Sequence, residues 1–100
     1  MEYTKELIDE KVKGFIEMYD GSRSFTEAVE HNVPFYYRRH KICIVPTTIV
    51  NLAFNNPEFR MSEALVKALR EYGAKRTTRQ TYLNGEQNTY VQCWIFNVCK

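Results

Sequence analysis

A helical pattern followed by two strand patterns around a tight turn fills Pro57–Phe96 and constrains the fold more than any other stretch. The apolar residues of its first part recur at i, i+4, i+7, i+8 and i+11, the spacing of one helix face: Met61, Leu65, Ala68, Leu69 and Tyr72. Ser62 can cap the first turn of this helix, and Gly73 can end it in the left-handed conformation. We therefore predict a helix over residues 62–72.

The residues after this helix have the pattern of a basic β-hairpin. The first strand contains three cations, Lys75, Arg76 and Arg79, among threonines that favour extended backbone. Asn84-Gly85 then permits positive φ at both central positions of a type I′ turn. The return strand is predicted over Thr89–Val98, where β-branched and aromatic side chains are frequent.

Two helices are predicted near the start of the chain. The first covers Tyr3–Tyr19, with Thr4 as its capping residue and an apolar stripe of Leu7, Val12, Phe15, Ile16 and Tyr19. The second covers Phe25–His31, and Ser24 stands three residues before Glu27, which is the spacing of a capping box.

A strand and a further helix are predicted between these helices and the 62–72 helix. The strand covers Lys41–Val45, and Phe35–Arg38 has a weaker β pattern. Pro46 suits the first position of a helix, because its missing N–H has no partner there in any case. The helix Thr47–Phe54 is almost wholly apolar, so we expect it to be buried on most sides.

The predicted elements after residue 24 follow the order helix, strand, helix, turn, helix, strand, wing, strand. This is the order of a winged helix-turn-helix, with residues 55–61 as the turn between its two helices. The predicted fold class is therefore α+β, a winged helix-turn-helix with an additional N-terminal helix. We expect a single domain over residues 1–100, with an accessory helix at 1–20 and a winged-helix core at 25–98.

The charge of the chain is low overall but unevenly distributed. The formal net charge is +2, yet residues 1–20 carry six acidic and three basic side chains, whereas residues 58–80 carry three acidic and six basic ones. This separation permits a basic surface on a nearly neutral protein. No apolar run approaches the roughly 20 residues of a membrane span, and the first residues are too charged for a signal peptide, so we expect a cytoplasmic protein without membrane contact.

The candidate nucleic-acid-binding residues lie on the 62–72 helix and on the hairpin. Recognition helices read base edges with their N-terminal half, and basic hairpins contact phosphates. The candidates are Arg60, Ser62, Glu63, Lys67, Arg70, Lys75, Arg76, Arg79 and Gln80. The same residues are also compatible with a purely structural role, because the helix residues can be a solvated polar face and the strand charges can protect a sheet edge against aggregation.

Residues 61–96 resemble the C-terminal winged-helix domain of phage, plasmid and poxvirus primase-helicases. The resemblance is carried by Ser62, Leu65, Leu69, Gly73, Lys75, Arg76, Asn84, Gly85 and Trp94. The chain departs from that pattern at Phe96, where a glycine is often found two residues after the tryptophan. The resemblance implies a DNA-binding domain of a replication protein, and no Walker phosphate loop is present to carry ATPase chemistry.

The remaining reactive residues do not form a recognisable catalytic or metal-binding motif. The spacing of His40, Cys43, Cys93 and Cys99 is poor for zinc, and three cysteines fit reduced, buried thiols. No nucleophile signature is present. We therefore expect a protein that is not an enzyme and that needs no metal or cofactor.

Three binding functions are compatible with these patterns. The leading hypothesis is double-stranded DNA binding by a phage or mobile-element replication protein. The second is a protein-interaction winged helix that docks on a replication helicase or a host factor. The third is binding of single-stranded nucleic acid, with bases stacking on the aromatic residues Tyr82, Tyr90, Trp94 and Phe96 if these face outward.

Overall fold

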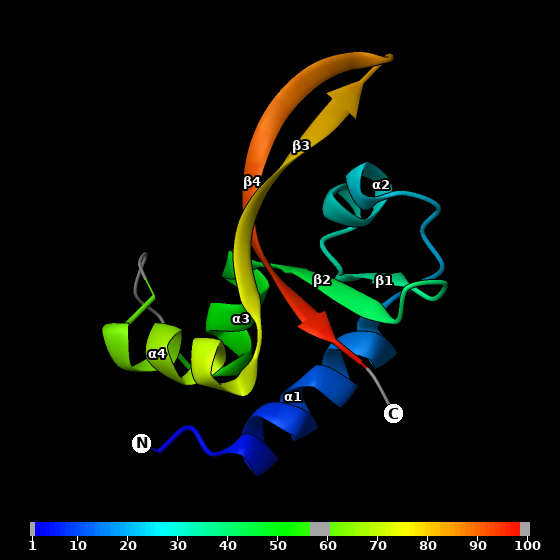
Figure 1. Cartoon of the computed structure of the whole chain (residues 1–100). Coiled ribbons are helices and arrows are strands. Elements are labelled where there is room, and N and C mark those ends of the chain that lie inside the picture. Colours follow the sequence, from blue (N-terminus) through cyan, green and yellow to red (C-terminus); the bar gives the residue numbers. More distant parts are fainter. Residues whose placement is uncertain (1, 57–60, 99–100) are drawn as a thin grey trace.

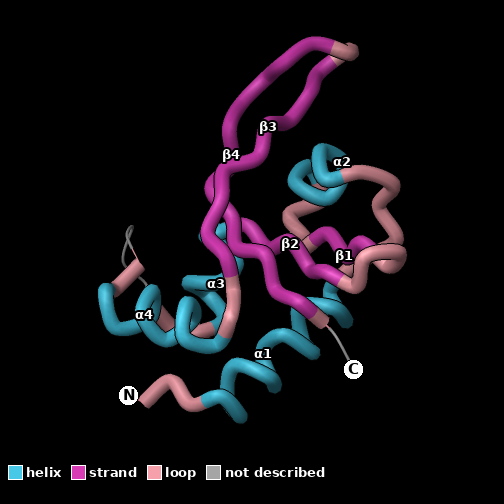
Figure 2. The backbone as a smooth tube through the Cα atoms, viewed as in Figure 1, coloured by secondary structure: helices cyan, strands magenta, loops and turns pink. Residues whose placement is uncertain are grey.

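The computed structural model describes residues 2–56 and 61–98, and this part of the chain has an α+β architecture (Figure 1). Its elements are α1 (Lys5–Met18), α2 (Phe25–Glu30), β1 (Phe35–Tyr37), β2 (Ile42–Pro46), α3 (Thr47–Ala53), α4 (Glu63–Tyr72), β3 (Lys75–Leu83) and β4 (Glu86–Asn97). The strands form one sheet of order β1-β2-β4-β3, and each neighbouring pair is antiparallel (Figure 2). The predicted succession of helices and strands is confirmed, with one further strand, β1, where the weaker β pattern lies. Within the described residues, none of the helices meets the length and hydropathy that a membrane span requires.

The sheet has apolar side chains on both faces, and different helices cover them. We call the side covered by α1, α3 and α4 the three-helix face; its sheet residues include Cys43, Val45, Trp94 and Phe96. We call the opposite side the α2 face; its sheet residues include Phe35, Ile44, Cys93 and Ile95, which pack with Phe25 and Ala28 of α2. Because successive side chains of a strand alternate between faces, the apolar run at the end of β4 serves both cores.

Helix α1 is part of the main core. Ile8, Val12 and Phe15 are at most 4% exposed and pack with α3, α4 and the three-helix face. The helix also contacts α4 directly, because the Tyr72 hydroxyl donates a hydrogen bond to a carboxylate oxygen of Asp9. The predicted accessory helix therefore packs into the same core as the 25–98 segment. The predicted stripe begins at Leu7, whereas the neighbouring Ile8 is the more deeply buried residue.

The predicted helix ends at 4, 24, 62 and 73 are confirmed. The side chains of Thr4, Ser24 and Ser62 each accept a hydrogen bond from the backbone N–H three residues later. Gly73 ends α4 with a φ of 111°, a left-handed conformation that costs glycine little.

The hairpin turn is also confirmed, but β4 begins earlier than predicted. Asn84 and Gly85 have φ values of 54° and 81°, as a type I′ turn requires. Pairing starts at the turn itself, with Leu83 opposite Glu86, and so β4 begins at residue 86 rather than 89. A register shift between Gln80 and Tyr82 interrupts the ladder. There the Thr81 hydroxyl bonds to the backbone and side chain of Thr89.

The region from β2 to α3 differs from prediction in one detail. Pro46 is the last residue of β2 and caps α3, so the first helical residue is Thr47. Helix α3 is buried on most sides, as predicted: Ile49, Val50 and Asn51 are buried, and the exposed residues Thr48 and Leu52 lie together on one side. Leu52 is 72% exposed. Of the predicted turn at 55–61, residues 57–60 lie outside the described part.

Two of the cysteines are core residues, as predicted. Cys43 and Cys93 are free thiols with no exposed surface. Burial raises the pKa of the Cys43 thiol to about 12 and that of the Cys93 thiol to about 11, so both stay protonated and unreactive at neutral pH. Cys99 lies outside the described residues.

Candidate nucleic-acid interface

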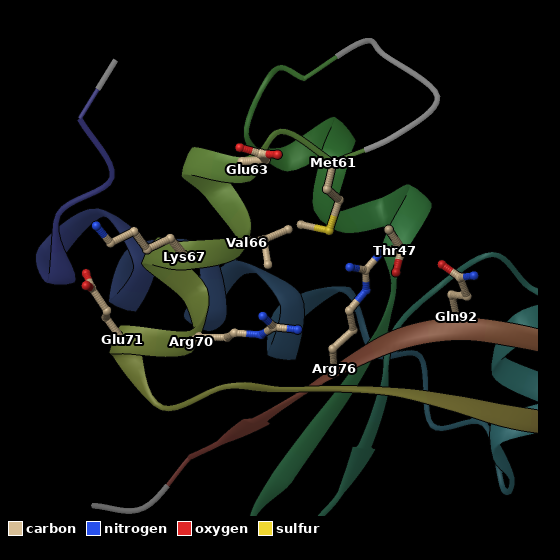
Figure 3. A pocket seen from close by; sticks show the side chains of 9 residues that line it. All are labelled: Thr47, Met61, Glu63, Val66, Lys67, Arg70, Glu71, Arg76 and Gln92. Carbon is tan, nitrogen blue, oxygen red and sulfur yellow. The ribbon is translucent and has the colours of Figure 1, made fainter.

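A groove lies between α4, the start of α3 and the base of the β3–β4 hairpin (Figure 3). Its volume is about 790 Å³. Its lining consists of Thr47, Met61, Glu63, Val66, Lys67, Arg70, Glu71, Arg76 and Gln92. Four of the sequence-predicted site residues, Glu63, Lys67, Arg70 and Arg76, therefore come together around one concave surface.

Helix α4 presents its polar side to this groove because its apolar side is held in the core. Leu65 and Leu69 have no exposed surface and fix the helix against the sheet. Glu63, Lys67 and Arg70 are exposed and recur at i, i+4 and i+7, so they share the opposite side. The structure confirms the amphipathic helix expected from the sequence: its apolar side is buried and its polar side is exposed.

Arg76 brings a positive charge to the groove from the hairpin. It is paired with Trp94 across the two strands, and its guanidinium carbon lies 6.0 Å from the centroid of the Trp94 ring. Figure 3 shows the Arg70 side chain extending from α4 toward the hairpin and the Arg76 side chain extending from β3 toward Met61 and Thr47, with Lys67 and Glu71 on the outer side of α4. In residues 2–56 and 61–98, no carboxylate lies within ion-pair distance of Lys67, Arg70 or Arg76. The lining holds three basic and two acidic side chains, so it has a small net positive charge.

The cations of the hairpin do not share one surface. Lys75 is paired with Ile95, and Arg79 with Val91, which place both on the α2 face. The Arg79 guanidinium carbon lies 5.2 Å from the centroid of the Phe25 ring of α2. These three candidate phosphate contacts are therefore divided between the two faces of the hairpin, because side chains alternate along a strand.

The other candidates have different positions. Gln80 is paired with Tyr90 on the three-helix face, further along the hairpin than Arg76. The Ser62 hydroxyl is engaged as the cap of α4, accepting from the Leu65 N–H at 3.2 Å. Arg60 lies outside the described residues.

Sequence reasoning missed four polar or sulfur-containing side chains of the lining: Thr47, Met61, Glu71 and Gln92. Gln92 interrupts the apolar alternation of β4, which was the available signal for an exposed position. The Met61 sulfur accepts a hydrogen bond from the Trp94 indole N–H at 3.0 Å, which couples the groove floor to the core. The Thr47 hydroxyl is buried and has no hydrogen-bond partner among the described residues. Nothing in the sequence pattern marks Met61 or Thr47 as site residues.

The aromatic residues of the hairpin divide into buried and exposed pairs. Trp94 and Phe96 have no exposed surface, so the expectation that bases could stack on them is wrong. Tyr82 and Tyr90 are 50% and 71% exposed. These two tyrosines lie in the outer half of the hairpin, which extends away from the helices at its tip (Figure 1).

Asp20 and Ser22, between α1 and α2, form a hydrogen-bonded cluster with His31 at the end of α2. The Nδ1 atom of His31 lies 2.8 Å from a carboxylate oxygen of Asp20 and 3.2 Å from the hydroxyl of Ser22. The same hydroxyl donates to the other Asp20 oxygen at 2.5 Å, and this bond is the main cause of the lowered pKa of Asp20. Since both partners meet the same ring nitrogen, the imidazole cannot relay a proton from serine to aspartate. Within the described residues, no group of three His, Cys, Asp or Glu side chains is arranged to hold a metal ion.

Comparison of the chain with protein-family models, with curated proteins and with solved structures finds no match.

Proposed function

We propose that this chain is a DNA-binding winged-helix domain of a phage or mobile-element replication protein. In this proposal α4 enters the major groove of a duplex, and the base of the β3–β4 hairpin contacts the phosphate backbone beside it. The observation that carries the proposal is that Arg70 of the helix and Arg76 of the hairpin extend into one groove, with Lys67 alongside. The domain needs no catalytic group or cofactor for this role.

The connectivity of the sheet supports a winged helix. Strand β2 precedes the helix pair α3–α4, and it pairs with β4, whose other neighbour is β3. The hairpin thus follows the second helix directly, with only Gly73 and Ala74 between α4 and β3. In this arrangement the second helix and the hairpin are neighbours, so a duplex lying along α4 also meets the base of the hairpin.

The chemistry of the groove suits a mixture of phosphate and base contacts. Arginine and lysine without carboxylate partners attract phosphates and release their counterions. Glu63 stands in the first turn of α4, the part of a recognition helix that reads base edges, and a carboxylate there accepts a hydrogen bond from the cytosine amino group. The small net charge of the groove predicts moderate affinity and a marked dependence on salt.

A second candidate function, docking on another protein, has one observation in its favour. Tyr82, Leu83 and Tyr90 are between 50% and 71% exposed and lie near the end of the hairpin, where large hydrophobic side chains suit a protein interface. A replication helicase or a host factor is the partner class that this role would imply.

The DNA-binding proposal is tested by fluorescence anisotropy of a labelled mixed-sequence duplex at low salt. We expect the wild type to bind and the variant K67E/R70E to bind about tenfold or more weakly, because it reverses two charges at the groove. The matched control is R38E/R39E in the exposed β1–β2 turn, which changes the net charge equally but lies outside the groove lining. The proposal fails if no duplex is bound, or if both variants lose affinity equally.

A further inference from the structure

The three-helix face of the hairpin continues beyond the groove as a strip of exposed side chains and the half-buried Gln80. Cross-strand pairs place Arg76 with Trp94, Thr78 with Gln92, and Gln80 with Tyr90 on this face. Tyr82 follows Gln80 by two residues in β3, and the extra residue of the register shift between them lies in β4, so Tyr82 keeps the orientation of Gln80. From the groove outward, the strip therefore consists of Arg76, Thr78, Gln92, Gln80, Tyr90 and Tyr82.

The two tyrosines lie on either side of the register shift on this strip. Tyr90 stands directly opposite Gln80, and Tyr82, two residues further along β3, is paired with Gln87. Their exposure, 50% for Tyr82 and 71% for Tyr90, leaves ring surface open to solvent. No ring contact between either tyrosine and another aromatic side chain is found in the described residues.

The opposite face of the hairpin is braced by α2. The Tyr82 backbone N–H donates to the Thr26 hydroxyl at 3.1 Å, and Arg79 lies over the Phe25 ring. Thr81, on the same side, is only 3% exposed. The hairpin is thus held from behind while its tyrosine-bearing face stays open, so a ligand on that face meets a positioned surface.

We infer that this strip binds an unpaired DNA strand that continues from the duplex held at α4, with bases stacking on Tyr82 and Tyr90. The inference rests on the proposed function and adds a second ligand to it. The strip carries one cation, Arg76, and no carboxylate, so it does not repel a phosphate chain. Amide and hydroxyl groups between the cation and the rings can bond to backbone or base, and stacking on aromatic rings accepts any base. The core of a protein interface is usually apolar, whereas the residues beside the tyrosines, Thr78, Gln80 and Gln92, are polar.

The inference is tested by comparing a blunt duplex with the same duplex carrying an unpaired oligothymidine overhang, at either end, by anisotropy. We expect the wild type to bind one overhang substrate about tenfold more tightly than the blunt duplex. The variant Y82L/Y90L should bind both substrates equally, because leucine keeps an apolar side chain and removes the ring. The variant Y82F/Y90F should keep the preference.

The outcomes separate the two proposals. Equal binding of blunt and overhang substrates by the wild type overturns the inference and leaves duplex binding intact. Retention of the preference by Y82L/Y90L also overturns it. Self-association of the wild type in sedimentation velocity, lost in Y82L/Y90L and without any overhang preference, would assign the tyrosines to a second copy of the chain. Absence of binding to every substrate overturns the proposed function as well.

Discussion

Arg76 and Arg79 lie three residues apart in β3 and on opposite faces of the sheet. Arg76 is directed to the three-helix face over the ring of Trp94, and Arg79 lies on the α2 face over the ring of Phe25. Each guanidinium thus makes one ring contact, at 6.0 and 5.2 Å from the centroid respectively. The two arginines are therefore similar in their contacts and differ in the face of the sheet on which each one places its positive charge.

This pair makes a prediction about DNA binding. Arg76→Gln and Arg79→Gln each remove one charge and one cation–π contact, so each should lower stability by about 0.5–1 kcal/mol. Only Arg76→Gln should weaken duplex binding, by about fivefold, because only Arg76 lines the groove. Chemical denaturation and anisotropy on the same preparations measure the two effects. A larger affinity loss for Arg79→Gln would place the DNA on the α2 face instead.

The contact between α1 and α4 makes a prediction about pH. Burial and the neighbouring Asp9 carboxylate raise the pKa of Tyr72 to about 12 from an ordinary value of 10.0. Since the unfolded chain then ionises this hydroxyl at lower pH than the folded protein does, its contribution to stability is complete below pH 10.0 and is lost between pH 10.0 and about 12.

The variant Tyr72→Phe tests this linkage. It removes the hydrogen bond to Asp9 and should lower stability by about 1 kcal/mol at neutral pH. Urea denaturation at pH values from about 8 to about 11 should show a shallower decline for the variant than for the wild type. Parallel declines would mean that Tyr72 titrates alike in the folded and unfolded chain.

Two glycines give opposite predictions for the same substitution. Gly73→Ala should lower stability by about 1–2 kcal/mol, because φ is 111° there and alanine is strained in that region. Gly14→Ala should raise stability by about 0.5–1 kcal/mol, because Gly14 lies inside α1 and an added Cβ meets nothing within 4 Å. Thermal unfolding of the two variants beside the wild type measures both signs. A destabilised Gly14→Ala would show that α1 packs more closely than the structure indicates.

Features determined by local chemistry were predictable from the sequence. The caps at Thr4, Ser24 and Ser62 depend on one side chain and the backbone a few residues away, and Asn84-Gly85 specifies its turn through φ alone. Amphipathic spacing was enough to orient α4, since Leu65 and Leu69 leave a single face for the core.

Features that depend on tertiary pairing were not predictable in the same way. The alternation of β3 could have separated Arg76 from Lys75 and Arg79, but which side each one joins depends on the register with β4. The apolar side chains of β4 alternate between two cores, one on each face of the sheet. The sequence does not say that α2 covers one face and that α1, α3 and α4 cover the other. For the same reason the sequence allowed a stacking role for Trp94, whereas this residue lies in the core with its indole N–H bonded to Met61.

The salt dependence of duplex binding tests the central claim most directly. For B-DNA, the logarithm of the binding constant falls with the logarithm of salt concentration by about 0.9 for each phosphate neutralised. The variant K67Q/R70Q/R76Q neutralises the groove, and R38Q/R39Q/K41Q neutralises three exposed cations of the β1–β2 turn as a matched control. We predict that the groove variant has a slope shallower than that of the wild type by about 2–3, while the control keeps the wild-type slope. A control slope that falls as much as the groove slope, or a groove variant with the wild-type slope, would contradict the account.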